Sequence, residues 1–133
     1  MDVEELMRRC AALPGAWRDN PWGHQYPVYK VGGAPDVERE RGRIFAFCGA
    51  ETLGLKCGSR EEADEWLLRY PEDAAVMPHL GRSGWNDLLL AGTIPDEELV
   101  EALQDSYRMV VSRLPRRLRP AGWEQLPPPT LPT

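Results

Sequence analysis

Apolar side chains recur every three or four residues in three segments of the chain, within residues 6–13, 63–70 and 99–114. That spacing gathers them on one face of a helix, which can then pack on a core. Each segment follows a residue type that favours a helix N-terminus and ends at a proline. The pattern therefore predicts helices over residues 2–13, 59–70 and 95–114.

Strands are predicted between these helices, where short apolar or alternating runs are bounded by glycine, proline and polar residues. Residues 43–48 are apolar almost without interruption, which is typical of a central strand covered on both faces. The element order predicts an α+β fold with three helices, mainly on one face of a single antiparallel sheet of five to six strands. The predicted strands are 27–31, 43–48, 52–57, 74–77 and 84–90, and the run 16–19 is compatible with a sixth.

The chain of 133 residues is long enough for one domain with its own core, which we predict over residues 1–118. Residues 119–133 are rich in proline and predict an extended C-terminal tail. Trp123 in this tail is expected either to dock on the domain or to belong to a partner-binding motif. Residues 32–42 are expected to form a long polar hairpin loop.

Charge is unevenly distributed along a chain whose net charge is −5. Residues 1–59 are balanced, residues 60–105 carry a net charge of −9, and residues 106–133 carry +4. Nucleic-acid-binding proteins usually have a basic surface, because neutralising phosphates supplies most of their non-specific affinity. Only a local basic face could therefore bind nucleic acid here. The arginines within 113–119 offer one, although we favour the interpretation that they balance the acidic middle segment.

No stretch is long and apolar enough to be a transmembrane helix, and the acidic, amphipathic N-terminus is unlike a secretory signal. We therefore expect a cytoplasmic protein. Its three cysteines, Cys10, Cys48 and Cys57, have no metal-ligand spacing and lie in apolar surroundings, so buried reduced thiols are expected. With two histidines in the chain, we expect no metal and no cofactor.

Residues with catalytic chemistry are isolated rather than grouped in a motif. His24 lies on a predicted turn beside Trp22, and a general base there would need a nucleophile and an orienting acid such as Asp19. A structural histidine is the simpler interpretation. Cys57 precedes the second predicted helix, where a thiol pKa can fall, but strand alternation places it with core leucines. We therefore expect no enzymatic activity.

Residues 81–85 (GRSGW) are the best candidate for a binding loop. Two glycines allow close backbone approach, Arg82 has donors suited to phosphate or carboxylate, and Trp85 has a ring for stacking. An ordinary turn followed by a core tryptophan is an equally good interpretation. The arginines of the 32–42 loop alternate with acids, a pattern that more often forms a solvated turn than a phosphate clamp.

Several short sequence motifs, in the same order along the chain, resemble those of a known family. They are LPGA (13–16), PWGH (21–24), VGG (31–33), IFA (44–46), LKC (55–57), RYP (69–71), GRSGW (81–85), IPDEEL (94–99) and DSY (105–107). From the first predicted helix to about residue 114, the chain resembles the MmcQ/YjbR family of small bacterial proteins. The resemblance implies an α+β fold like that of the frataxin homologue CyaY, and a proposed double-wing mode of DNA binding. It brings no catalytic residues.

The leading prediction is therefore a non-enzymatic DNA-binding module that uses the loops between strands. The expected contacts to the DNA backbone are Lys30, Arg43, Lys56 and Arg82, and Trp85 is expected to stack on bases or act as a wedge.

Two other functions stay open. One is a protein-interaction adaptor that uses acidic helix faces or the proline-rich tail. The other is a small-ligand-binding protein with a pocket near Trp22, His24 and Trp85. The oligomeric state is not determined by these patterns.

Overall fold

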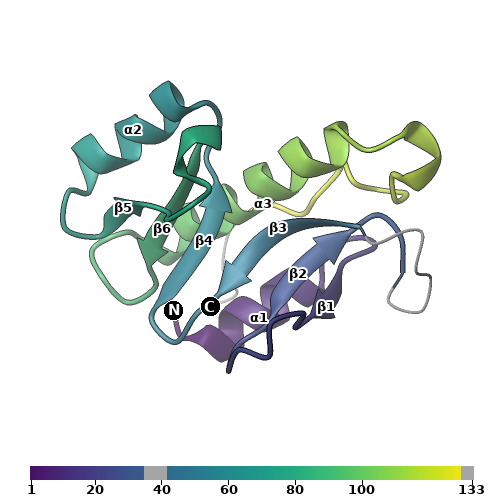
Figure 1. Cartoon of the computed structure of the whole chain (residues 1–133), viewed down its shortest axis with the longest axis horizontal. Helices are drawn as coiled ribbons and strands as arrows, with labels where there is room; N and C mark the ends of the chain where they lie inside the picture. The colour runs from purple at the N-terminus through teal and green to yellow at the C-terminus, as the bar shows by residue number, and fades with distance from the viewer. Residues whose placement is uncertain (35–41, 130–133) are drawn as a thin grey trace.

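The computed structural model describes residues 1–34 and 42–129 and has the predicted element order (Figure 1). The helices are α1 (Val3–Ala11), α2 (Arg60–Arg69) and α3 (Asp96–Ser112). The strands are β1 (Trp17–Asp19), β2 (Val28–Val31), β3 (Arg43–Cys48), β4 (Thr52–Lys56), β5 (Ala74–Val76) and β6 (Trp85–Leu89). Two short 3-10 helices, η1 (Gly81–Ser83) and η2 (Arg116–Leu118), complete the fold. Most of the predicted 32–42 hairpin loop lies outside the described residues.

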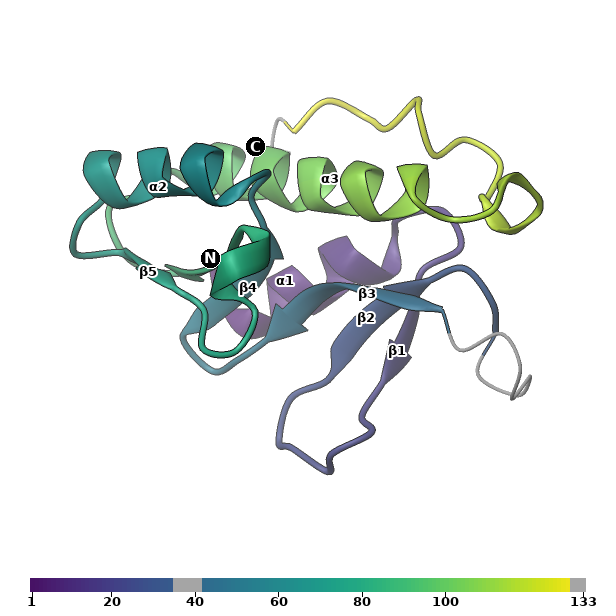
Figure 2. The same cartoon turned by 45° about the horizontal axis from the view of Figure 1, so that its top comes forward.

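The six strands form one antiparallel sheet in the order β1-β2-β3-β4-β6-β5, which confirms the predicted α+β class. Leu53 and Leu55 of β4 face α1 and α3 in the core. Asn86, which pairs with Leu55 across the sheet, donates to the carbonyl of Ala63 in α2. All three helices therefore cover the same face of the sheet, as Figure 2 shows from above α2 and α3.

The predicted helix starts are confirmed by the capping contacts of the first two helices. The Asp2 carboxylate accepts a hydrogen bond from the Glu5 amide at 2.8 Å. Ser59 and Glu62 form a reciprocal capping box at the start of α2. Such caps satisfy amide groups that the first turn of a helix leaves without a carbonyl partner.

Strand β3 corrects the prediction that residues 43–48 are covered on both faces. Across from β2, Tyr29 pairs with Ala46 and Lys30 with Ile44, so Phe45 is an extra residue in a β-bulge. Phe45 is buried edge-on against Tyr107 of α3, whereas Phe47 lies half-buried on the face without helices. The bulge explains why the adjacent residues Phe45 and Ala46 are both in the core, and Phe47 extends the apolar run on the other face, where it contacts Trp22 and Trp85 rather than a helix.

Strands β3 and β4 pair over two residue pairs and then diverge towards the start of β3 (Figure 1). Helix α3 closes the opening between them. The buried hydroxyl of Ser106 accepts from the Lys56 amide at 3.1 Å and donates to the Phe45 carbonyl at 2.8 Å. This one side chain therefore satisfies a backbone group on each diverging strand, which a buried backbone requires.

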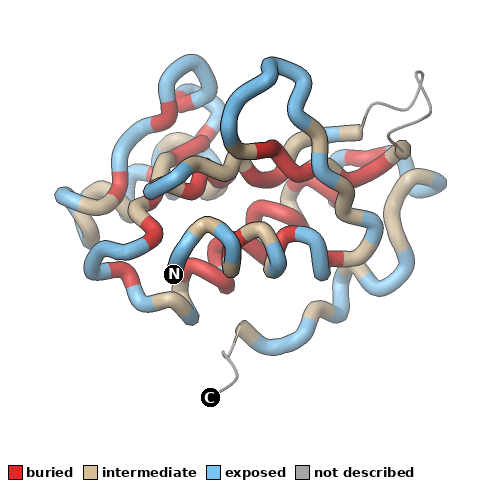
Figure 3. Tube along the Cα trace, turned by 90° about the horizontal axis from the view of Figure 1, so that it is seen from below, coloured by how far each residue is buried: buried red, intermediate tan, exposed pale blue. Residues whose placement is uncertain are grey.

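The segment after α3 folds back along that helix up to residue 129 (Figure 2). Arg119 donates to the carbonyls of Leu114 and Ser112 at 3.0 and 2.8 Å, and its guanidinium lies 5.8 Å from the Trp123 ring. Gln104 of α3 donates to the Pro127 carbonyl at 2.9 Å. Trp123 thus docks on the domain, one of its two expected roles. Figure 3 shows buried positions through the middle of the molecule and exposed ones along its loops.

Candidate functional site

The strand register brings three of the predicted contact residues to one end of the sheet. Arg43 begins β3, Lys56 ends β4, and Arg82 lies in η1 directly before β6. Because β4 is antiparallel to both of its neighbours, these three positions lie at the same end. Helix α3 also ends there, since Leu114 packs against Gly32 after β2. The basic end, as we name it, comprises Arg43, Lys56, Arg82, Arg113 and Arg116.

Four of these five side chains are exposed, and within the described residues none of the four makes an ion pair. Arg113 and Arg116 come from the C-terminal part of the chain, which was expected to balance the acidic middle segment. In the described part of the molecule they form no ion pair with that segment. Their guanidinium groups are therefore available to an anionic partner.

The Lys56 side chain, by contrast, is held in place by hydrogen bonds to the protein backbone. Its ammonium donates to the Gly58 carbonyl at 3.3 Å and to the Ser83 carbonyl, so it ties the end of β4 to η1. Burial lowers the pKa of Lys56, and the nearby charge of Arg113 lowers it further. Lys56 contributes charge to the basic end but is less free to move towards a ligand than the arginines.

Arg60 is a cation at this end that the sequence analysis did not single out. It donates to the Gly81 carbonyl at 2.9 Å and to the Asn86 side-chain oxygen at 2.6 Å, and it pairs with Asp64 at 2.8 Å. It thereby joins α2 to η1 and β6. A basic residue at the first position of a helix is unremarkable in a sequence, so no pattern points to this role.

Lys30, the fourth predicted backbone contact, directly precedes Val31, the residue that pairs with Arg43, so it lies at the same end of the sheet. Its ammonium pairs with the Asp19 carboxylate at 2.7 Å and lies 5.3 Å from the Trp17 ring. The hydrogen bond from Lys30 lowers the pKa of Asp19. Lys30 is therefore left out of the basic end not because of its position but because Asp19 already engages its charge.

The opposite end of the sheet carries acidic side chains that are engaged in contacts. Asp96 pairs with the Met1 amino group at 2.9 Å, and Glu98 accepts from Arg69 and from the Tyr70 hydroxyl. Hydrogen bonds from Thr93 lower the pKa of Asp73. The acidic end, as we name it, comprises Glu51, Glu72, Asp73, Asp96, Glu97 and Glu98.

Three aromatic rings run across the sheet face that has no helices. The Trp22 and Phe47 rings stack with centroids 6.4 Å apart and an interplanar angle of 11°. Phe47 also meets Trp85 edge-on at 5.5 Å. Trp85 is 8% exposed and Trp22 is 58% exposed. The burial of the Trp85 ring favours the alternative interpretation of a core tryptophan over a stacking or wedge residue, and Trp22 is the exposed indole.

A hollow of about 270 Å³ lies beside Trp22 and His24, and Phe47 rather than Trp85 closes it. The backbone of His24 is held by the Asn20 side chain at 2.9 Å. Asp19, the acid that could have oriented His24, faces Lys30 instead. The arrangement provides an apolar surface but no base and acid pair for catalysis.

Comparison with known proteins places the chain in a family. The family model described as YjbR matches residues 11–109. The chain belongs to the YjbR family. It is 29% identical over 122 residues to "Uncharacterized protein YjbR" of Escherichia coli, in strain K12 and in O157:H7, covering 90% of this chain and 95% of each relative.

Two solved structures share the YjbR-family fold. A Deinococcus radiodurans protein with a DUF419 domain aligns with a TM-score of 0.74 and 27% identity, covering 89% of this chain and 85% of that one. A Pseudomonas syringae protein aligns with a TM-score of 0.61 and 17% identity, covering 83% and 99%. The second likeness concerns the fold alone.

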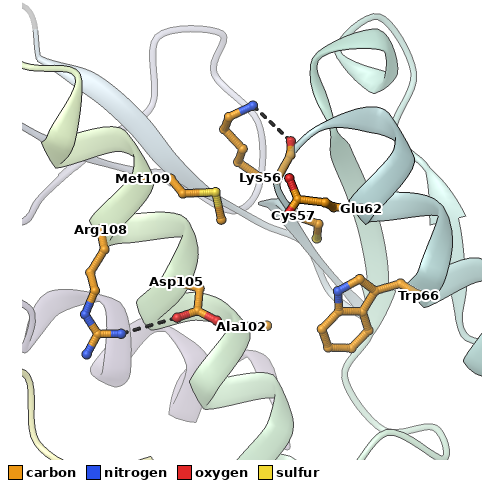
Figure 4. A pocket seen from close by; sticks show the side chains of 9 residues that line it. Lys56, Cys57, Glu62, Trp66, Ala102, Asp105, Arg108 and Met109 are labelled. Carbon is orange, nitrogen blue, oxygen red and sulfur yellow. Dashed lines mark hydrogen bonds and ion pairs between the residues drawn. The ribbon is translucent and has the colours of Figure 1, made fainter.

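A cleft of about 290 Å³ lies between α2 and α3, next to the basic end (Figure 4). Cys57 is at its base, where burial raises the pKa of the thiol to about 11. A thiol with that pKa is protonated at neutral pH and is a poor nucleophile. The cleft is lined by Lys56, Cys57, Gly58, Glu62, Trp66, Ala102, Asp105, Arg108 and Met109.

Within residues 1–34 and 42–129, no three His, Cys, Asp or Glu side chains come together as a group that could hold a metal ion. In the same part of the chain, no helix has the length and apolar character needed to cross a membrane.

Proposed function

We propose that this YjbR-family protein is a non-enzymatic module that binds the phosphate backbone of DNA through its basic end. The observation that supports this most is that exposed arginines of β3, of η1 and of the segment after α3 lie at one end of the molecule and make no ion pair within the described residues. These segments are distant in sequence and share that end only in the fold.

Arginine suits this role because its planar guanidinium can donate two parallel hydrogen bonds to a phosphate. The connection from β2 to β3 and the connection from β5 to β6 both emerge at the basic end. The β5–β6 connection, which includes Arg82, would give this end a loop contact with a duplex. The acidic end lies away from that surface, so the net charge of −5 does not by itself oppose binding there.

The proposal is tested with a fluorescent duplex, whose anisotropy is followed at about 50 mM and about 200 mM salt. We expect binding at the lower salt that weakens steeply at the higher one. The double variant Arg82→Gln/Arg113→Gln should lose about tenfold or more in affinity. The matched control Arg8→Gln/Arg69→Gln removes the same charge outside the basic end and should bind like the wild type within about twofold.

Two results would count against the proposal. One is no change in anisotropy at micromolar protein in low salt. The other is an equal loss of affinity in the two double variants, because net charge alone would then explain the binding.

A further inference from the structure

We propose that the cleft between α2 and α3 binds one unstacked nucleobase-type ring, a planar heteroaromatic ring with amino or carbonyl groups at its edge. This inference deepens the proposed function and partly rests on it, since it gives a nucleic acid a second point of contact. The evidence for this inference is the shape of the cleft, the side chains that form its walls and the balance of charges around it.

The two walls of the cleft offer surfaces for the two faces of a flat ring. Figure 4 shows Trp66 of α2 and Met109 of α3 on opposite sides of the open space, with Ala102 beside them. An indole stacks on a base, and a thioether makes favourable contacts with aromatic rings. The Trp66 ring has neighbours of its own, with the Arg69 guanidinium 5.5 Å and the Tyr70 ring 5.9 Å from it.

The helices that form these walls are fixed at both ends of the cleft. At the acidic end, Glu98 of α3 accepts from Arg69 and Tyr70 after α2. Towards the basic end, Ser106 of α3 accepts from the backbone of Lys56. A cleft that is held open in this way does not have to form when the ligand arrives, which limits the entropy cost of binding.

The charges around the cleft balance and therefore favour a neutral ligand group over a phosphate. Lys56 and Arg108 are the cations, and Glu62 and Asp105 are the acids; Asp105 accepts from Arg108 at 3.3 Å. Carboxylates accept hydrogen bonds from the amino groups of bases, and the cations can donate to ring nitrogens and carbonyl oxygens. The edge of a base presents both kinds of group.

The size and place of the cleft restrict the ligand further. At about 290 Å³ it is close to the lower limit of small-molecule pockets, which suits a single ring. Lys56 belongs both to the cleft and to the basic end. A strand whose phosphates lie on the basic end would therefore reach the cleft with an unpaired base, whereas the bases of an intact duplex would stay stacked.

The test compares three ligands: a single-stranded oligonucleotide, the duplex of the same sequence, and free adenosine or cytidine. Trp66→Ala removes one wall, and Ala102→Leu fills the cleft while leaving both walls in place. Trp22→Ala, on the other face of the sheet, is the matched control. Thermal melting of each variant establishes that it is folded, and Ala102→Leu decides the outcome if Trp66→Ala does not fold.

We expect Trp66→Ala and Ala102→Leu to weaken single-strand binding about 5- to 100-fold, with duplex binding changed less than about twofold. Trp22→Ala should leave both affinities unchanged. The inference is overturned if both cleft variants bind the single strand like the wild type, or if they weaken the duplex to the same extent.

The measurement with free nucleoside distinguishes a failure of this inference from a failure of the proposed function. If no nucleic acid binds at the basic end, free nucleoside at millimolar concentration should still shift the indole N–H NMR signal of Trp66 and not that of Trp22. Absence of that shift would overturn the cleft as a base-binding site, whatever the result with oligonucleotides.

Discussion

The two ends of the sheet use their charges in different ways. At the acidic end, charged groups contact one another: Met1 with Asp96, and Arg69 with Glu98. At the basic end, Arg43, Arg82, Arg113 and Arg116 are exposed and, in the described residues, have no ion-pair partner. Exposed single charges contribute little to folding. Part of the acidic end thus uses its charge for contacts within the fold, although Glu51, Glu72 and Glu97 are exposed there without an ion pair in the described residues, whereas none of the four arginines of the basic end has one.

The largest expected effect comes from reversing that excess charge. The triple variant Arg82→Glu/Arg113→Glu/Arg116→Glu should lose on the order of 100- to 1000-fold in duplex affinity at low salt, because phosphate attraction becomes repulsion. Glu72→Arg/Glu97→Arg changes charge at the acidic end and should raise affinity by less than about threefold. If affinity rose there as much as it fell at the basic end, duplex binding would depend on net charge and not on where the charge lies.

A second prediction separates the structural cation of the basic end from the available ones. Arg60→Ala should lower the free energy of unfolding by about 2–3 kcal/mol, because the buried Asn86 oxygen and the Gly81 carbonyl lose their donor. Arg82→Ala should change it by less than about 0.5 kcal/mol. Urea unfolding measures both, and similar values for the two variants would contradict the assignment of Arg60 to the fold and Arg82 to a ligand.

Single charge removals should give smaller effects that still differ between the ends. Arg82→Gln should lower duplex affinity about fivefold and reduce the slope of log K against log salt by about 0.9, the loss of one phosphate contact. Arg69→Gln, at the acidic end, should leave that slope unchanged. Binding isotherms at four salt concentrations decide this, and equal slopes for Arg82→Gln and the wild type would remove Arg82 from the interface.

The smallest expected effects are opposite pH dependences of two aspartates. Hydrogen bonds from Thr93 lower the folded-state pKa of Asp73, so its contribution to stability is complete above the unfolded value of about 3.9 and is lost as pH falls through the folded value. Burial raises the folded-state pKa of Asp87, so that carboxylate opposes folding at neutral pH and ceases to do so below about pH 3.9.

At pH 7, Asp73→Ala should therefore melt below the wild type and Asp87→Asn slightly above it, by at most about 4 °C for the latter. The Asp73 difference should shrink as pH falls below about 4, whereas the Asp87 difference should shrink above that pH and be lost by then. Thermal melts between pH 3 and 7 measure this, and differences of the same sign for the two variants would contradict the hydrogen bonds of Asp73 and the burial of Asp87 as the causes.

Much of the fold could be predicted because its signals are local. The capping residues Asp2 and Ser59 mark helix starts, and apolar spacing marks the faces that become buried. The bulge at Phe45 could not be predicted, because an extra apolar residue in a bulge and a strand buried on both faces give the same continuous run. The role of Ser106 between β3 and β4 was only weakly indicated in the sequence, by a polar residue at a core position of the third helix.

The candidate site was less predictable, because it depends on pairing between distant segments. The pattern singled out Lys30, Arg43, Lys56 and Arg82, but only the strand register shows that they share an end, and only the contact with Asp19 shows that the charge of Lys30 is engaged. The burial of Trp85 depends on Phe47, which no local pattern around Trp85 reveals. The cleft lies between two helices whose separation is a tertiary property.

The most direct test of a basic end that binds DNA is a titration of the ¹⁵N-labelled protein with duplex, followed by NMR. The account predicts that the backbone amide signals of Arg43, Arg82 and Arg113 shift or broaden first, while those of Glu51, Asp73 and Glu97 stay in place. Shifts centred on the acidic end, or an unchanged spectrum at saturating duplex in low salt, would contradict it.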